Sequence, residues 1–136
     1  MGVTNGRPEP TANGKSVSSF RDLRVWQAAM DLVVRVYQFA EGFPRDEGYG
    51  LTSQVRRAVI SAPSNIAEGH AREHLREYLH HLSMAQGSLA ELDTQIEIAI
   101  RLGYASTEQG RQLLAEVAAV ARQLKALRTA LERKLP

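Results

Sequence analysis

Hydrophobic residues recur at helical spacing from Phe20 onward and divide the chain into four segments. In the third segment they follow one another at alternating steps of three and four, which is the spacing of one face of an α-helix. These residues are Leu75, Tyr78, Leu82, Ala85, Leu89, Leu92, Ile96 and Ala99. The fourth segment repeats the pattern with Leu113, Val117, Val120, Leu124, Leu127 and Leu131. No segment alternates in steps of two, so the pattern predicts helices and no strands.

Residues that begin or end helices set the expected boundaries. Asp22 is a candidate N-cap for the first helix, and Gly42-Phe43-Pro44 ends it. Gly103 suits the end of the third helix, while Ser106 and Gln109 have the spacing of a capping box for the fourth. We predict helices over residues 22–41, 47–69, 73–102 and 107–135. The fold class is therefore all-α: an up-down-up-down antiparallel four-helix bundle over residues 20–136, with left-handed supercoiling.

The first helix carries two adjacent apolar seams. One seam contains Trp26, Met30, Val33, Tyr37 and Ala40. The other contains Val25, Ala29, Leu32, Val36 and Phe39. Two seams make a stripe wider than one bundle core requires, so we assign the second to an oligomer interface. The alternative is a helix buried deeply within its own bundle.

Residues 1–19 are rich in Gly, Pro, Asn, Ser and Thr, and we expect them to form a flexible N-terminal tail. The chain contains no apolar run as long as a secretory signal or a membrane span needs. It also has no cysteine, which excludes disulfides and cysteine-ligated metals. We therefore expect a cytoplasmic protein with no membrane partner.

The charge pattern is more informative than the formal net charge of +2. Of the 17 basic residues, 14 are arginine, whose planar guanidinium suits phosphates and ion pairs at interfaces, although an arginine-biased genome would give the same excess. Arg122, Lys125 and Arg128 follow one another at steps of three. The candidate nucleic-acid-binding residues are Arg21, Arg24, Arg56, Arg57, Arg122, Lys125 and Arg128. The alternative is an ordinary mixed-charge surface.

Two polar motifs need a structural alternative beside a functional one. His70, Glu73 and His74 match the spelling of a zinc-peptidase motif, but no third ligand is evident, and the alternative is a solvated start of the third helix, with no bound metal. Pro63 removes a backbone donor inside the second helix and predicts a kink, relieved by Ser61, Ser64, Asn65 or a water. The structural polar set is Pro63, Asn65, Glu68 and Glu91. Asn65 and Glu68 would contact a ligand or neighbouring subunit in the functional interpretation.

Several stretches resemble one bacterial family of four-helix bundles. They are Phe20-Arg-Asp-Leu-Arg-Val-Trp-Gln, Phe43-Pro44, Tyr49-Gly-Leu-Thr-Ser-Gln-Val-Arg-Arg-Ala, Ser64-Asn-Ile-Ala-Glu-Gly, Gly87-Ser-Leu-Ala-Glu-Leu and Leu102-Gly-Tyr104. The family is named for reading frames in intervening sequences of 23S ribosomal RNA genes, and it includes the accessory variability determinant of diversity-generating retroelements. His70-Ala71-Arg72 departs from the usual continuation after the fourth stretch, and the mild charge favours the broader family over the retroelement branch.

The resemblance implies a homopentamer that is not an enzyme, needs no cofactor and has no catalytic residues to transfer. It also implies binding of RNA or DNA, or of a nucleic-acid enzyme such as a reverse transcriptase. A structural adaptor that binds another protein and no nucleic acid is the alternative. A metal-dependent hydrolase at His70 and His74 is a third hypothesis.

Overall fold

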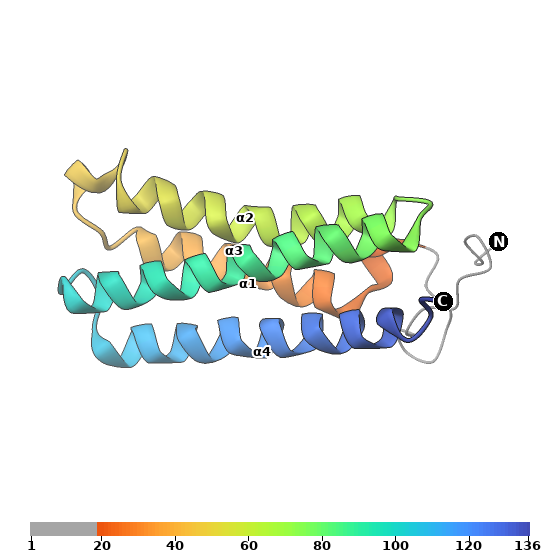
Figure 1. The fold of residues 1–136 in the computed structure, drawn as a ribbon. Coiled ribbons are helices and arrows are strands. Elements are labelled where there is room, and N and C mark those ends of the chain that lie inside the picture. Colours follow the sequence, from red (N-terminus) through yellow and green to blue (C-terminus); the bar gives the residue numbers. More distant parts are fainter. Residues whose placement is uncertain (1–18) are drawn as a thin grey trace.

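The structure, a computed structural model, describes residues 19–136, and this part of the chain consists of helices and turns (Figure 1). A 3₁₀ turn, η1 (Phe20–Asp22), precedes α1 (Arg24–Ala40), and a second, η2 (Arg45–Glu47), precedes α2 (Leu51–His70). The chain ends with α3 (Leu75–Arg101) and α4 (Thr107–Glu132). These bounds confirm the predicted all-α up-down-up-down bundle, while its supercoil hand stays a prediction. The expected tail over residues 1–19 lies outside the described residues, apart from Ser19.

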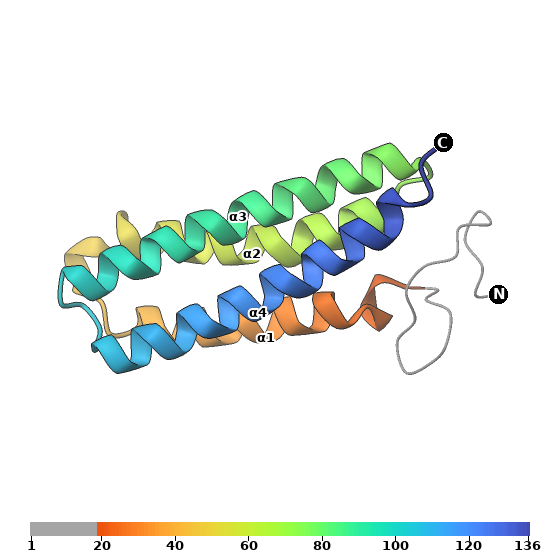
Figure 2. The ribbon, with the colours of Figure 1, turned by 60° about the horizontal axis from the view of Figure 1, so that its bottom comes forward.

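The four helices occupy the corners of a bundle, and each packs against two neighbours. α1 contacts α2 and α4, while α3 also contacts α2 and α4 (Figures 1 and 2). Within residues 19–136, the diagonal pairs α1 with α3 and α2 with α4 make no contact. The start of α1, the turn between α2 and α3 and the end of α4 share one end of the bundle, beside the C-terminus (Figure 1).

The core confirms the seams predicted for the last two helices. From Tyr78 to Ala99, every residue of the predicted α3 seam is buried, and Leu75 at its start is half-buried. All members of the α4 seam, from Leu113 to Leu131, are buried as well. Burial of these side chains is the main stabilising contribution to the bundle, at about 1.5–3 kcal/mol for each large apolar residue.

The seam of α1 that we assigned to an oligomer interface lies inside the bundle, so that assignment was wrong. Val25, Ala29, Leu32 and Val36 are at most 5% exposed. The physical reason is that α2 and α4 pack against this side of α1. The other seam is turned outward, with Met30 40% exposed and Trp26, Val33 and Tyr37 half-buried. The fifth assigned residue, Phe39, is half-buried and packs edge-on against Phe43.

The structure confirms two of the predicted helix ends and contradicts one. The Ser106 hydroxyl accepts the backbone N–H of Gln109 at 3.1 Å, which confirms the α4 cap. Gly103 follows α3 with a φ of 77°, a left-handed conformation that glycine adopts without strain. Asp22 is not the N-cap of α1, because it belongs to η1 and Leu23 takes the cap position.

The start of α2 is held by a carboxylate rather than by a cap residue. Glu47 Oε1 accepts the backbone N–H of Leu51 at 3.0 Å, and Glu47 Oε2 accepts the hydroxyl of Tyr104 at 2.6 Å. The hydrogen bond from Leu51, and then that from Tyr104, holds the pKa of Glu47 below its usual value. The same bond to Glu47 raises the pKa of the Tyr104 hydroxyl. This contact ties the link between α1 and α2 to the turn between α3 and α4.

α2 and α3 approach each other closely near their shared turn. A Cβ added at Gly69 would stand 2.8 Å from the Cβ of His81 and 3.2 Å from the backbone oxygen of Tyr78. Tyr78 is fully buried, so it has no room to move away. Glycine is therefore required at this position by packing. A Cβ added at Gly87, in the middle of α3, would meet no atom within 4 Å.

Candidate functional site

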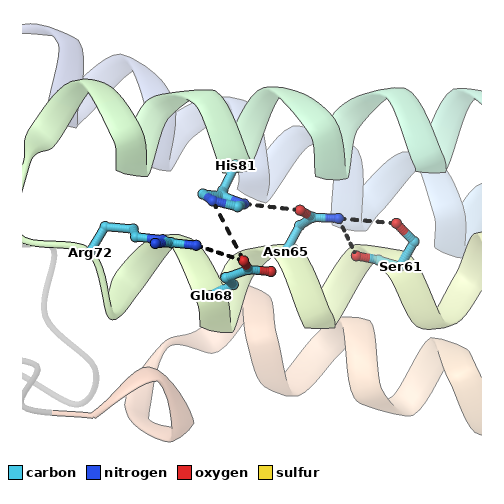
Figure 3. Close-up of polar contacts among 5 residues, drawn as sticks. All are labelled: Ser61, Asn65, Glu68, Arg72 and His81. Carbon is cyan, nitrogen blue, oxygen red and sulfur yellow. Dashed lines mark hydrogen bonds and ion pairs between the residues drawn. The ribbon is translucent and has the colours of Figure 1, made fainter.

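A line of hydrogen-bonded polar side chains runs along the contact between α2 and α3 (Figure 3). Asn65 donates from Nδ2 to the carbonyl oxygen and the hydroxyl of Ser61, both at 3.0 Å. Its Oδ1 lies 3.1 Å from Nδ1 of His81 on α3. The hydroxyl of Ser88 on α3 donates to Ser61 at 2.8 Å. Asn65 thus donates to the backbone of α2 and joins α2 to α3.

Glu68 continues this line toward the turn. Its Oε2 accepts from Arg72 at 2.8 Å and lies 3.9 Å from Nε2 of His81 (Figure 3). His81 is therefore placed between the amide of Asn65 and the carboxylate of Glu68. Pro63 lies in the same helix, which continues as one element from Leu51 to His70. The carbonyl that Pro63 leaves without a backbone donor is that of Val59, whereas Asn65 donates to the carbonyl of Ser61, so relief of the proline by these side chains stays a prediction.

The histidines of the suspected zinc motif do not stand on one helix. His70 is the last residue of α2 and packs edge-on against Tyr78, with 5.8 Å between ring centroids. His74 is the exposed N-cap of α3, after a turn. The motif requires an unbroken helical turn between its histidines, so this geometry does not support the hydrolase hypothesis. Among residues 19–136, no three His, Asp or Glu side chains are grouped as metal ligands would be.

Glu91 is exposed on α3 and lines a groove between α2 and α3 of about 390 Å³. Arg57, one of the candidate nucleic-acid-binding residues, lines the same groove from α2. Its guanidinium is 3.4 Å from the hydroxyl of Ser53. In this part of the chain Arg57 and Glu91 form no ion pair with each other. The structure thus places Arg57 apart from the basic residues of α1 and α4.

The structure divides the predicted basic stripe of α4. Arg122 and Lys125 are exposed, whereas Arg128 is half-buried, donates to Gln86 on α3 and lies 4.0 Å from Glu132. Each step of three residues turns about 60° short of a full helical turn, so the stripe winds around α4 and its last member meets α3. Arg56 is also held, because its guanidinium stacks on Tyr37 at 4.8 Å from the ring centroid.

Basic side chains are distributed unevenly along the bundle axis. The half beside the C-terminal end comprises residues 20–31, 61–87 and 121–134, with nine basic and six acidic residues. The other half, residues 32–60 and 88–120, has six basic and eight acidic residues. The first half, which we call the basic half, carries the start of α1, the α2–α3 turn and the end of α4 (Figure 2). We call the other half the acidic half.

The two halves also differ in how their cations are engaged. In the acidic half, Glu116 pairs with Arg35, and Glu97 pairs with both Arg101 and Arg111. The first pair closes at 2.5 Å, and the Glu97–Arg111 pair at 2.8 Å. In the basic half, six exposed cations stand outside any ion pair of the described residues. They are Arg21, Arg24, Arg76, Arg122, Lys125 and Arg133, and we call them the free cations.

Sequence reasoning missed several residues of these sites. His81 and Gln95 carry no motif of their own, but antiparallel helices bring together residues equidistant from their turn. Asn65 with His81 follows that rule, whereas Ser61 with Ser88 departs from it by about one helical turn. Arg133 caps the end of α4, and the tertiary fold brings that end of α4 to the same end of the bundle as the α2–α3 turn and the start of α1 (Figures 1 and 2).

These observations define a small all-α protein. It is a four-helix bundle in which hydrogen bonds between polar side chains join neighbouring helices. None of the described helices has a stretch that is both long and apolar enough to cross a membrane. A family model described as 23S rRNA-intervening sequence protein matches residues 21–126, which is most of the chain. The chain belongs to the 23S rRNA-intervening sequence protein family, as the resemblance implied.

A solved structure shows the same fold. It is the crystal structure of a protein of unknown function from the S23 ribosomal protein family of Bacteroides thetaiotaomicron VPI-5482. The two chains are 20% identical and superpose with a TM-score of 0.68, over 75% of this chain and 95% of the other. At this identity the likeness establishes the bundle architecture alone. No curated protein matches the chain.

Proposed function

We propose that this chain is a non-catalytic, homo-oligomeric bundle that binds RNA or DNA through the free cations of its basic half. The observation that carries the proposal is the contrast between the two halves. Glu97 and Glu116 pair with three of the six cations of the acidic half, whereas the free cations of the basic half pair with no acidic side chain among the described residues. Phosphates are the anions that exposed arginines bind best, because the guanidinium donates two parallel hydrogen bonds.

The proposal revises which predicted residues take part. Arg21, Arg24, Arg122 and Lys125 remain, and Arg76 and Arg133 join them. Arg56 and Arg128 are removed, since each is half-buried and held inside the protomer. Arg21 is kept because its guanidinium, which stacks on Phe20 at 4.9 Å from the ring centroid, is exposed. Arg57 is removed because it faces a groove of mixed charge. A nucleic-acid enzyme such as a reverse transcriptase would bind the same RNA or DNA strand as this protein.

Exposed apolar side chains support self-assembly, in which the resemblance implies a homopentamer. Met30 and Val34 are 40% and 56% exposed on α1, and Ile98 and Leu102 are 42% and 55% exposed on α3. α1 and α3 are diagonal corners of the bundle, so the two patches lie on different sides. A contact between unlike patches is heterologous, and repeated contacts of that kind form a ring when the rotation between successive subunits closes. A ring would also gather the free cations of all subunits and strengthen their field.

Charge reversal tests the nucleic-acid site. The pair Arg122→Glu and Lys125→Glu removes two free cations, and the pair Arg45→Glu and Arg101→Glu makes the same change of net charge in the acidic half. Binding of fluorescently labelled 20-nucleotide RNA and DNA is followed by anisotropy. We expect the first pair to weaken binding about tenfold or more, since two phosphate contacts are lost. The second pair should change it little. Equal losses would mean that only net charge matters, and the site would be refuted.

Mixing experiments test the assembly. Wild-type protein should have about five times the protomer mass by light scattering. Met30→Glu with Val34→Glu, and separately Ile98→Glu with Leu102→Glu, should each yield smaller species, whereas the control Ala115→Glu with Ala126→Glu on α4 should not. Because each defective variant keeps one good patch, an equimolar mixture should form heterodimers. A monomeric wild type would overturn the assembly, and monomers in the mixture would overturn the heterologous contact. Assembly without any nucleic-acid binding would favour the protein-adaptor function.

A further inference from the structure

The groove between α2 and α3 is built from polar side chains on both walls. Gln54, Arg57 and Ser61 line it from α2, while Ser88, Glu91 and Gln95 line it from α3. Its volume of about 390 Å³ falls within the usual range of small-molecule sites. At its inner edge Ser88 donates to Ser61 at 2.8 Å, so the two walls are fixed relative to each other there.

Opposite charges face each other across this groove without meeting. Arg57 lies one helical turn before Ser61 on α2, and Glu91 lies about one turn after Ser88 on α3, so both flank the bonded pair on the side away from the α2–α3 turn. The guanidinium and the carboxylate nevertheless form no ion pair, and neither pairs with another described residue. Among the described residues, the Arg57 guanidinium contacts the hydroxyl of Ser53 alone, at a long distance of 3.4 Å. The groove therefore offers one cation and one anion with space between them.

Gln95 supplies a third group that awaits a partner. It is 6% exposed, yet it lines the groove. Its side-chain oxygen is buried and accepts no hydrogen bond from the described residues. A buried acceptor without a donor costs about 1–3 kcal/mol, so this wall of the groove is polar and incompletely satisfied. Gln95 and Glu91 stand one helical turn apart on the same wall, which places both acceptors on the side opposite Arg57.

From these three groups we propose that the groove binds a small zwitterion of the α-amino-acid class with a polar side chain. Its carboxylate pairs with Arg57 and its ammonium with Glu91, and the side-chain amide of Gln95 lines the groove beside them. A ligand with a single charge would satisfy one wall and face a like charge on the other. The hydroxyls of Ser61 and Ser88 and the amide of Gln54 then surround the side chain. This site is separate from the proposed nucleic-acid surface and does not depend on it.

Ligand and protein changes can be matched to test the assignment. Wild-type protein is first screened against the natural amino acids by saturation-transfer difference NMR, and the best binder is titrated by calorimetry. The charged groups are exposed, so we expect a dissociation constant of about 1 mM. Arg57→Gln and Glu91→Gln should each weaken binding about fivefold. Because both residues are exposed, both variants should fold, and circular dichroism checks this.

Modified ligands then show which group each residue contacts. The N-acetylated amino acid lacks the ammonium, and the amino-acid amide lacks the carboxylate. The wild type should bind both forms about fivefold more weakly than the parent amino acid. In Glu91→Gln, N-acetylation should cause no further loss, while in Arg57→Gln amidation should cause none. If the loss caused by N-acetylation were as large in Glu91→Gln as in the wild type, or the loss caused by amidation as large in Arg57→Gln, the assigned contacts would be refuted. The absence of binding by every amino acid at about 10 mM would refute the site itself.

Discussion

Replacing Gly69 by alanine tests how closely α2 and α3 pack. The added Cβ would stand 2.8 Å from the Cβ of His81, closer than such carbons normally approach, and the neighbouring Tyr78 is fully buried. Relief requires that the two helices separate, and overpacking of this kind costs about 1–3 kcal/mol. Alanine favours a helix over glycine by about 1 kcal/mol, which offsets part of the cost. We therefore expect a net loss of up to about 2 kcal/mol.

Gly87→Ala is the matched control, because it makes the same chemical change at a helical position where the Cβ meets no atom within 4 Å. There the helix preference acts alone, and stability should rise by about 0.5–1 kcal/mol. Urea unfolding followed by circular dichroism measures both variants at one protein concentration. If Gly69→Ala were as stable as Gly87→Ala, the close approach of α2 and α3 would be refuted.

Three further predictions concern the pH response, the polar line and the core. Tyr104→Phe should destabilise the bundle near neutral pH, and pH-dependent melting should show the difference shrink as the pH falls below about 4.5, because the lowered pKa of Glu47 contributes stability only while the carboxylate is ionised. Asn65→Ala should cost about 1–3 kcal/mol in urea unfolding, since it leaves His81 without its partner, and a neutral outcome would contradict the contact. Leu92→Ala, at a fully buried site, should cost about 2.7–5 kcal/mol, with a loss under about 1 kcal/mol counting against the core.

The fold could be predicted from the sequence because its last two helices each carry one apolar seam. Steps of three and four from Tyr78 to Ala99 leave only one face to bury, and the structure buries it. α1 carries two seams of equal regularity, and nothing local distinguishes them. The positions of α2 and α4 decide which seam turns inward, and that information belongs to the assembled bundle. The assignment of Val25 and its seam to an interface failed for this reason.

The candidate sites were less predictable, because the partners that a charged side chain meets in the fold decide whether it is available to bind a ligand. Arg122 and Arg128 look alike in the sequence, yet only Arg128 reaches Gln86 on the neighbouring helix. Arg111 belonged to no evident patch and is bound to Glu97 at 2.8 Å. The groove residue Gln95 gives no signal beyond its polarity beside the buried Ile96. Which cations remain free is thus decided by tertiary ion pairs that no local pattern records.

The salt dependence of nucleic-acid binding by the wild-type protein tests the central claim most directly. Anisotropy titrations of single-stranded RNA and DNA at several salt concentrations give the observed affinity, and its logarithm is plotted against that of the salt concentration. Binding through free cations predicts a straight line with a slope of about −0.7 for each phosphate contacted, so several contacts give a slope of about −2 to −4. A flat line, or no binding at about 50 mM salt, would contradict the proposed function.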